Sequence, residues 1–284
     1  MSKVGLVLEG GSLRGLYSAG VMDIMMDNNI DVDCIVGTSA GALFGPNYFS
    51  NQKGRAIRYN KRFCKDRRNI SFLSLLFTGN IVNKKFAYYK ITEKLDKFDN
   101  ETFMKSKKEL YATATNMKTG ESEYFQIKDV IKDMEKLRAT SAIPIMTRPV
   151  KINKEYYLDG GISDSIPIKK CMELNCDKII VILTQPDTYK KKILSNKKIK
   201  AINIVFKKYP KLIKRMMNRH NEYNECVEYI RNLEKDKKVF VIRPSENLDI
   251  DLIERNPEKL EKVYQIGIND MKKQIDDLKK YLKK

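Results

Sequence analysis

The first part of the chain alternates short apolar runs with helical patterns. Val4–Leu8 is wholly apolar and so are residues 34–36, as expected of parallel strands that are buried on both faces. Between them, residues 16–25 carry apolar side chains at helical spacing. Strand, turn and helix follow one another twice within about 50 residues, which predicts a parallel sheet covered by helices on both faces.

Further runs extend this sheet. The segment 178–184, KIIVILT, is the strongest buried-strand signal in the chain. A basic segment at 53–68 and a segment at 129–141, before Pro144, are predicted to be helical, and the apolar residues 72–77 are expected to be core or a lid over an apolar site. Additional strands are predicted at 110–115, 123–127 and 239–242, and residues 156–158 lead into Asp159-Gly160-Gly161.

The composition changes after Pro186. Residues 190–219 carry 12 basic side chains and no acidic one, with Pro210 interrupting their helical pattern, and an amphipathic helix is predicted from Pro257 onwards. We therefore expect a core domain at 1–184. Residues 185–284 are expected to form a basic, mostly helical extension, whose strand near 239–242 could rejoin the sheet.

Length and composition narrow the class of protein. A chain of 284 residues with 42% hydrophobic residues can bury a large core. It contains no apolar run of about 20 residues, and its apolar N-terminal stretch is too short for a signal-peptide core. Its five cysteines are odd in number and form no CxxC, and Cys171 and Cys176 have the spacing of ordinary core or helix-face residues. We expect a reduced, cytoplasmic location.

The net charge of +19 has two interpretations. A basic surface suits anionic lipid or nucleic acid, whereas Lys supplies 42 of the 55 basic residues, which equally indicates compositional bias. No nucleic-acid motif or stacking aromatics accompany the basic segments, so no nucleic-acid partner is expected. Peripheral contact with the anionic inner face of a membrane remains the functional interpretation, and a solvated surface is the alternative. The sequence does not indicate an oligomeric state.

One serine stands in a pattern suited to nucleophilic catalysis. Gly37-Thr38-Ser39-Ala40-Gly41 follows a predicted strand and precedes a predicted helix, as in a nucleophile elbow. The flanking glycines allow close approach of neighbouring backbone, and the helix N-terminus favours developing negative charge. A plain turn of small residues is the alternative.

Two other glycine-containing turns accompany it. The loop from Glu9 to Gly15 lacks the Walker A pattern, and Ser12 stands where a dinucleotide fingerprint needs glycine. A backbone oxyanion hole is the better use for its N–H groups. Asp159-Gly160-Gly161 could bring a carboxylate close to another loop, although Asp-Gly is also an ordinary turn signal.

Together, the glycine loop, the GxSxG elbow and the later DGG motif resemble the patatin-like phospholipase family, over about the first 185 residues. Residues 239–246 and the helical tail resemble a bacterial branch of it. The resemblance implies an α/β fold, a three-layer α/β/α sandwich with a mainly parallel sheet. It also implies a serine lipid acyl hydrolase (phospholipase A, lysophospholipase or esterase) acting on a lipid acyl ester through an acyl-serine intermediate.

The resemblance assigns residues as follows. Ser39 would be the nucleophile and Asp159 its base, and no metal or cofactor is implied. The oxyanion hole would be formed by the amides of Gly10, Gly11 and Ser12. The supporting residues would be Arg14, Gly37, Gly41 and Gly160.

Ser12 departs from the family's usual third glycine. If its backbone requires a positive φ, serine costs on the order of 1 kcal/mol. The lone histidine, His220, could complete a Ser39, Asp159 and His220 triad in the chain order of α/β-hydrolases, but it lies in a charged helical segment. A carboxylate base needs burial to raise its pKa, so we expect Asp159 to be shielded from water. Acyl transfer on the same site and non-catalytic binding of anionic surfaces are the other candidate functions.

Overall fold

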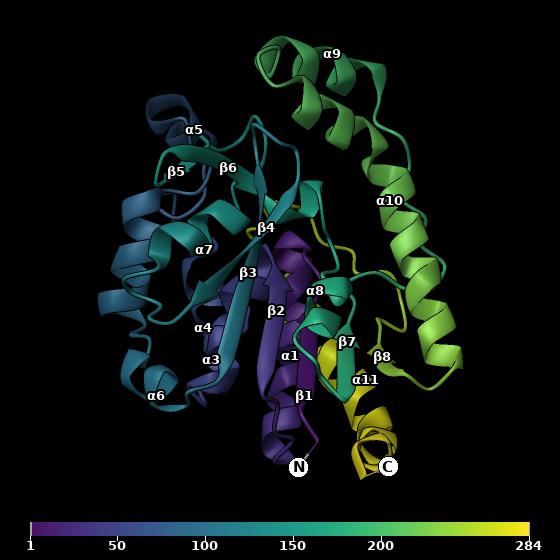
Figure 1. Cartoon of the computed structure of the whole chain (residues 1–284). Helices are drawn as coiled ribbons and strands as arrows, with labels where there is room; N and C mark the ends of the chain where they lie inside the picture. The colour runs from purple at the N-terminus through teal and green to yellow at the C-terminus, as the bar shows by residue number, and fades with distance from the viewer. Residues whose placement is uncertain (1, 284) are drawn as a thin grey trace.

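The computed structural model describes residues 2–283, with the backbone alone at 72 and 73. Its centre is an eight-stranded mixed sheet with the order β5-β6-β3-β2-β1-β7-β8, and β4 pairs with β3 (Figure 1). The pairs β1–β2, β1–β7, β2–β3 and β7–β8 are parallel. The strands are β1 (Val4–Leu8), β2 (Cys34–Thr38), β3 (Glu109–Asn116), β4 (Ser122–Ile127), β5 (Val150–Ile152), β6 (Glu155–Asp159), β7 (Lys178–Ile182) and β8 (Val239–Ile242).

Helices cover both faces of this sheet. Long helices line its two sides, and the two termini lie at the end of the molecule opposite to α5 and α9 (Figure 1). The α-helices are α1 (Gly15–Asp27), α2 (Ala40–Phe44), α3 (Pro46–Phe49), α4 (Arg55–Phe63), α5 (Phe72–Thr78), α6 (Asn100–Lys105), α7 (Met134–Thr140), α8 (Ile168–Glu173), α9 (Asn196–Val205), α10 (Pro210–Lys235) and α11 (Pro257–Lys283). Shorter or wider turns are η1 (Ser12–Arg14), η2 (Lys84–Leu95) and η3 (Gly160–Ile162).

The side chains of the central strands alternate between two cores. Leu6 and Leu8 of β1 pack with the helices α1 and α11, whereas Val7 packs with side chains of α8 and α10. Ile35 and Val36 of β2 divide in the same way. Because both faces of these strands are buried, the strands are apolar at every position and not only at every second one. The expected three-layer α/β/α arrangement with a mainly parallel sheet is confirmed.

The region after residue 185 contributes to the same sheet. β8 pairs in parallel with β7, with Ile179 opposite Val239 and Ile182 opposite Ile242. The strand expected near 239–242 therefore does rejoin the sheet. The rest of the region is mostly helical, and α10 begins at Pro210, where the ring's fixed φ suits a first helical position. The boundary at 184/185 stays a prediction.

Several predicted elements have different ends. The basic helix expected at 53–68 is α4, Arg55–Phe63, and the helix expected at 129–141 is α7, Met134–Thr140. α5 begins within the expected apolar segment and leaves Leu76 and Phe77 exposed, while the side chains at 72 and 73 lie outside the described residues. The π-helix η2 has no counterpart among the predictions, because its wider turn does not follow the 3.6-residue period.

Candidate active site

The carboxyl ends of β1 and β2 bring the glycine loop and the serine turn together. Leu8 at the end of β1 lies opposite Gly37 of β2, so the segments that follow both strands leave the same edge of the sheet. β1 is also where the chain order of the sheet reverses, between β2 on one side and β7 on the other. Crevices at such reversals are the usual ligand sites of open α/β sheets.

Ser39 lies on a strained turn between β2 and α2. Its φ of 52° and ψ of −119° are rare for a residue with a side chain. Its N–H donates to Thr140 Oγ1 at 2.8 Å, and the side chain is nearly buried. A Cβ at Gly41 would lie 2.6 Å from the Leu8 carbonyl oxygen, so the helix packs against β1 only with glycine there. Gly37 lies within β2 itself.

Asp159 reaches Ser39 through the pairing of β3. β4 occupies one edge of β3 from Leu110 to Thr115, so β2 and β6 share the other edge. β2 pairs as far as Thr113, and β6 continues from Ala114, which lies opposite Asp159. Asp159 therefore stands one step beyond the end of β2, beside the serine turn.

A direct hydrogen bond joins the two side chains. Ser39 Oγ donates to Asp159 Oδ2 at 2.7 Å, and the Gly161 N–H donates to Oδ1 at 2.7 Å. The backbone of Asp159 is fixed as well, since its N–H donates to the Ala142 carbonyl at 2.9 Å. Gly160 follows in η3, packed against the backbone of β3. The carboxylate is thus held in one orientation toward the serine hydroxyl.

Desolvation raises the pKa of Asp159. Hydrogen bonds from Ser39 and Gly161 and the positive charge of Arg219 oppose this shift, but burial is the largest effect and the pKa remains above its ordinary value. The residue as a whole is partly buried, and its carboxyl group is desolvated, in line with the shielding expected from the sequence. The direction of the shift is the one that makes a carboxylate a better proton acceptor.

The glycine loop after β1 lies beside Ser39. The Gly10 N–H donates to the Ser165 carbonyl at 3.1 Å, so the expectation of a free oxyanion donor at Gly10 is corrected. Within residues 2–283, the N–H groups of Gly11 and Ser12 have no such acceptor. Ser12 has a φ of 52°, the positive value that glycine adopts without strain. Two amides therefore remain available at this loop.

Two cavities meet at Ser39 and Ser12. One, of about 170 Å³, is lined mainly by apolar and aromatic side chains, including Leu43, Phe44 and Ile91. The other, of about 530 Å³, extends toward α9 and α10 and includes Asp159. Ser39 lies where the two cavities meet. A molecule with one apolar end and one polar end could therefore place an end in each cavity and its middle at the serine.

The sequence does not show which charged side chains line the second cavity. Arg14 of the glycine loop lines it, and its Nε is buried without a hydrogen-bond partner in the described part of the chain. Lys191 and Arg219 also line it, and Arg219 Nε donates to the Gly161 carbonyl. The basic run at 190–219 marked this region as a whole, but only the packing of α10 selects these two side chains.

Glu9 anchors the glycine loop to α10. It is buried, and it accepts hydrogen bonds from the Thr184 N–H at 2.6 Å and the Tyr223 hydroxyl at 2.8 Å. Burial raises its pKa more than these bonds and nearby cations lower it. The first residue of the loop is thereby a structural link to the extension.

His220 does not contact the serine turn. Its Nδ1 lies 3.0 Å from the Met217 carbonyl oxygen, within its own helix α10. It lines an adjoining surface cavity, which shares Lys191 and Arg219 with the larger cavity at Ser39 but does not include Ser39 itself. The geometry therefore offers Ser39 a carboxylate partner directly and does not assemble the Ser-Asp-His triad.

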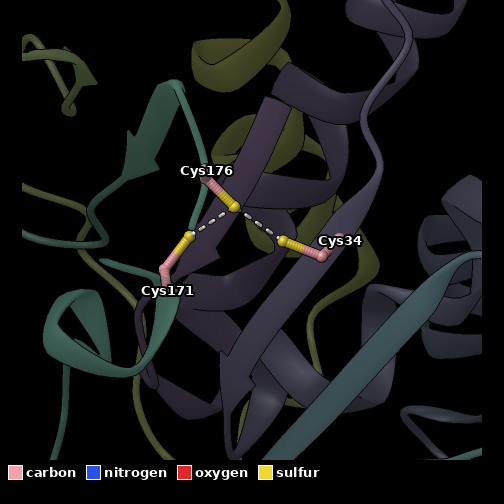
Figure 2. A group of neighbouring side chains, drawn as sticks. All are labelled: Cys34, Cys171 and Cys176. Atoms are coloured by element: carbon pink, nitrogen blue, oxygen red, sulfur yellow. Dashed lines mark hydrogen bonds between the residues drawn. The ribbon is translucent and has the colours of Figure 1, made fainter. Parts of the chain in front are cut away.

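Three cysteines form a cluster away from this site (Figure 2). Cys34 Sγ and Cys176 Sγ are 3.1 Å apart, and Cys171 Sγ is 3.9 Å from Cys176 Sγ. All three sulfurs lie within 4.8 Å of one another. Structural zinc sites use four ligands, and this group contains three in the part of the chain described. The cluster, with Cys34 and Cys171 buried, packs as part of the core between β2 and α8.

Comparison with known protein families identifies two regions. The model of the patatin-like phospholipase family matches residues 6–172. The model of a domain of unknown function, DUF6363, matches residues 209–283, which include α10 and α11. The first match contains the glycine loop, the serine turn and Asp159.

Individual proteins are similar over the same region. The uncharacterized protein YjjU of Escherichia coli is 31% identical over 65% of this chain and 52% of its own length. The probable lipid hydrolase 463L of Invertebrate iridescent virus 6 is 27% identical over 70% of this chain and 76% of its own. Lysophospholipase NTE1 of Meyerozyma guilliermondii is 28% identical over 63% of this chain and 12% of its own. The chain thus spans about half of the first relative and a small part of the third.

Among solved structures, VipD from Legionella pneumophila aligns over 97% of this chain and 67% of its own, with a TM-score of 0.47 and 13% identity. None of the helices within residues 2–283 has the length and apolar character needed to cross a membrane.

Proposed function

The chain belongs to the patatin-like phospholipase family, and we propose that it hydrolyses acyl esters of glycerolipids with Ser39 as nucleophile and Asp159 as base. The observation that carries the proposal is the 2.7 Å hydrogen bond from Ser39 Oγ to Asp159 Oδ2, on a carboxylate whose pKa is raised. The names of the lipid hydrolase and lysophospholipase relatives support the same substrate class.

The proposed reaction has two steps. Asp159 accepts the proton of Ser39 Oγ as the oxygen attacks the ester carbonyl, and the same carboxyl returns that proton to the departing glycerol oxygen. The acyl group is then bonded to Ser39. Water attacks this acyl-serine while Asp159 accepts its proton, and the proton passes to Ser39 Oγ as the fatty acid leaves.

Negative charge on the carbonyl oxygen needs donors during both steps. The amides of Gly11 and Ser12 support this role, because they lie on the loop beside Ser39 and have no acceptor in the described structure. Fixed backbone donors of this kind lower the barrier because they need no reorganisation as the charge develops. Arg14 adds a positive charge to the same loop.

The apolar cavity supports binding of the acyl chain. Leu43, Phe44 and Ile91 line it, and Ser39 is at its mouth. An acyl chain placed there would remove apolar surface from water, which contributes about 0.8 kcal/mol for each buried methylene. The ester carbonyl would then lie at the serine, between the apolar cavity and the polar one.

We also propose that the mouth of the site contacts an anionic lipid surface. Leu76 and Phe77 of α5 and Ile204 and Val205 of α9 are among the most exposed large apolar side chains. Both helices lie at the end of the molecule away from the termini (Figure 1). α9 belongs to the basic run 190–219, so apolar and cationic groups occur together there, as in interfacial proteins.

The test is hydrolysis of p-nitrophenyl esters of graded chain length. Ser39→Ala and Asp159→Asn should each lower kcat/KM by at least about a thousandfold, while circular dichroism stays unchanged. His220→Ala is the control and should keep wild-type activity. Release of free fatty acid, rather than of a new ester when an alcohol is added, distinguishes hydrolysis from acyl transfer. Activity that survives in Ser39→Ala would refute the proposed nucleophile.

A further inference from the structure

The larger cavity beside Ser39 is lined by four cationic side chains. Lys198 of α9 is exposed, whereas the other three are partly buried and come from separate parts of the chain. Arg14 comes from the glycine loop, Lys191 from the segment before α9, and Arg219 from α10. The cavity has a volume of about 530 Å³ and also includes Ser39 and Asp159. It lies on the other side of the serine from the apolar cavity.

None of these cations forms an ion pair within residues 2–283. Arg14 Nε is buried without an acceptor. Lys191 Nζ lies 4.1 Å from the centre of the Tyr223 ring. Arg219 donates through Nε to the Gly161 carbonyl, which leaves its two other nitrogens without a described acceptor. Most charged side chains near a protein interior are paired, so the three partly buried cations around this cavity require a reason.

The acidic side chains around the cavity form no ion pair with these cations in the part of the chain described, although Glu9 and Asp159 attract them at longer range. Glu9 is bonded to Tyr223 and the Thr184 N–H, and it attracts Lys191 and Arg14 without forming an ion pair with either in the described structure. Asp159 faces Ser39 and Gly161. Asp251 is exposed at the rim.

Lys191 is held in place for this arrangement. Its N–H donates to Asn224 Oδ1 at 2.9 Å, and its carbonyl accepts from Asn224 Nδ2 at 3.1 Å, which fixes the backbone to α10. Burial and the neighbouring charges of Arg219 and Arg14 lower its pKa to about 7. An anion in the cavity would reverse this effect and favour the ammonium form.

We propose that Arg14, Lys191 and Arg219 bind a phosphate group, that of a glycerophospholipid whose ester lies at Ser39. This inference rests on the proposed function and specifies its substrate class. Arginine guanidiniums bind phosphate oxygens in pairs, and a lysine adds a point charge. Because Ser39 stands at the junction of both cavities, the acyl chain occupies the apolar one and the phosphate the cationic one.

The proposal gives the C-terminal region a role in substrate choice. Lys191 and Arg219 both lie beyond residues 6–172, which the patatin-like family model matches, and Arg219 lies within residues 209–283, matched by the domain of unknown function. α10 is tied to the glycine loop by the Glu9–Tyr223 hydrogen bond. The region would thus supply headgroup contacts to a catalytic loop formed by the family core.

The test compares two substrates with the same acyl chain, lysophosphatidylglycerol and uncharged monoacylglycerol, both below their micelle concentrations. Lys191→Gln should lose on the order of tenfold more kcat/KM on the phospholipid than on the monoacylglycerol, mainly through KM. The matched control is Lys192→Gln, an exposed neighbour that does not line the cavity, and it should behave as wild type. Equal losses on both substrates would overturn the proposal.

A binding measurement keeps this test separate from catalysis. Ser39→Ala protein should bind glycerol 3-phosphate by titration calorimetry, and adding Lys191→Gln should weaken that binding about tenfold while Lys192→Gln does not. Binding without hydrolysis of either substrate would refute the proposed function and leave an anion site. Binding of inorganic phosphate, with no preference of the wild type for the phospholipid, would assign the cavity to free phosphate and overturn the lipid site.

Discussion

Two serines of the candidate site adopt backbone conformations that favour glycine. Ser39 and Ser12 both have a φ of 52°. For a residue with a Cβ, this conformation costs on the order of 1 kcal/mol. At Ser39 the strained turn places the side chain where both cavities meet, which suits the nucleophile that we propose. At Ser12, where the family usually has glycine, the side chain has no comparable role in the structure.

The strain at Ser12 can be measured directly. Ser12→Gly should be more stable than Ser12→Ala by about 1 kcal/mol in free energy of unfolding, because only glycine adopts this φ without a steric cost. Urea denaturation followed by circular dichroism gives the difference. Ser12→Ala is the matched control, since it removes the hydroxyl but keeps the Cβ. Equal stabilities for the two variants would show that the loop is not strained at this position.

The raised pKa of Asp159 predicts a pH dependence. A general base works in its deprotonated form, so kcat/KM should fall as the pH decreases through a pKa above the ordinary value of about 4. The profile should be recorded on an uncharged ester. Burial lowers the pKa of Lys191 to about 7, so Lys191→Gln is the control, and the acid limb should persist in it. An acid limb at or below pH 4 would contradict the desolvated carboxylate.

At the scale of elements, the long C-terminal helix α11 crosses α1 at very short range. Gly267 of α11 packs against the Tyr17 backbone carbonyl of α1, and Gly20 of α1 packs against that of Tyr264. Neither position has room for a Cβ unless backbone moves. The two glycines therefore allow the helices to approach more closely than residues with a Cβ would permit. Met271 and Leu260 of α11 are buried in the same packing.

This crossing reverses the expected effect of a glycine replacement. Helix propensity alone predicts that Gly267→Ala stabilises the protein by about 1 kcal/mol. We expect it instead to lower the free energy of unfolding by about 1 to 3 kcal/mol, because the added methyl group overpacks the contact with α1. Lys273→Ala on the exposed face of α11 is the control and should change stability by less than about 0.5 kcal/mol. A more stable Gly267→Ala would refute the close contact.

At the scale of the whole molecule, the extension is joined to the core rather than attached beside it. β8 extends the sheet at β7, α11 covers α1, and Tyr223 of α10 bonds to Glu9 of the glycine loop. The region after residue 185 therefore completes the edge of the sheet and one wall of the larger cavity. The net charge of +19 adds a long-range attraction to anionic surfaces.

Membrane contact is the prediction at this scale. The protein should bind vesicles in proportion to their anionic lipid content, and binding should weaken with added salt because the charges are screened. The double change Leu76→Ser and Phe77→Ser should reduce binding further, since it removes the apolar part of the contact. Met104→Ser is the control, because Met104 is exposed on α6, far from α5 in Figure 1. If vesicle binding changed with neither the anionic lipid content nor the salt concentration, the proposed contact with an anionic membrane would be excluded.

The sequence alone determined the local features of this protein. The buried strands at 4–8 and 178–182, the elbow at Ser39 and the turn at Asp159 could be predicted because their signals are local: apolar runs, small residues and glycines at fixed spacing. Their order along the chain was enough to indicate the family. The pairing of Ser39 with Asp159 was expected only from that resemblance.

The tertiary structure decided which of these groups meet. The shared edge of β3 places Asp159 beside Ser39. The Ser165 carbonyl accepts a hydrogen bond from the Gly10 N–H. The packing of α10 brings Lys191 and Arg219 to one cavity. The sequence alone does not distinguish these two from the other basic side chains among the 12 in residues 190–219. Such contacts join residues more than a hundred positions apart, and local spacing contains no information about them. They depend on the strand order and on how the helices cover the sheet.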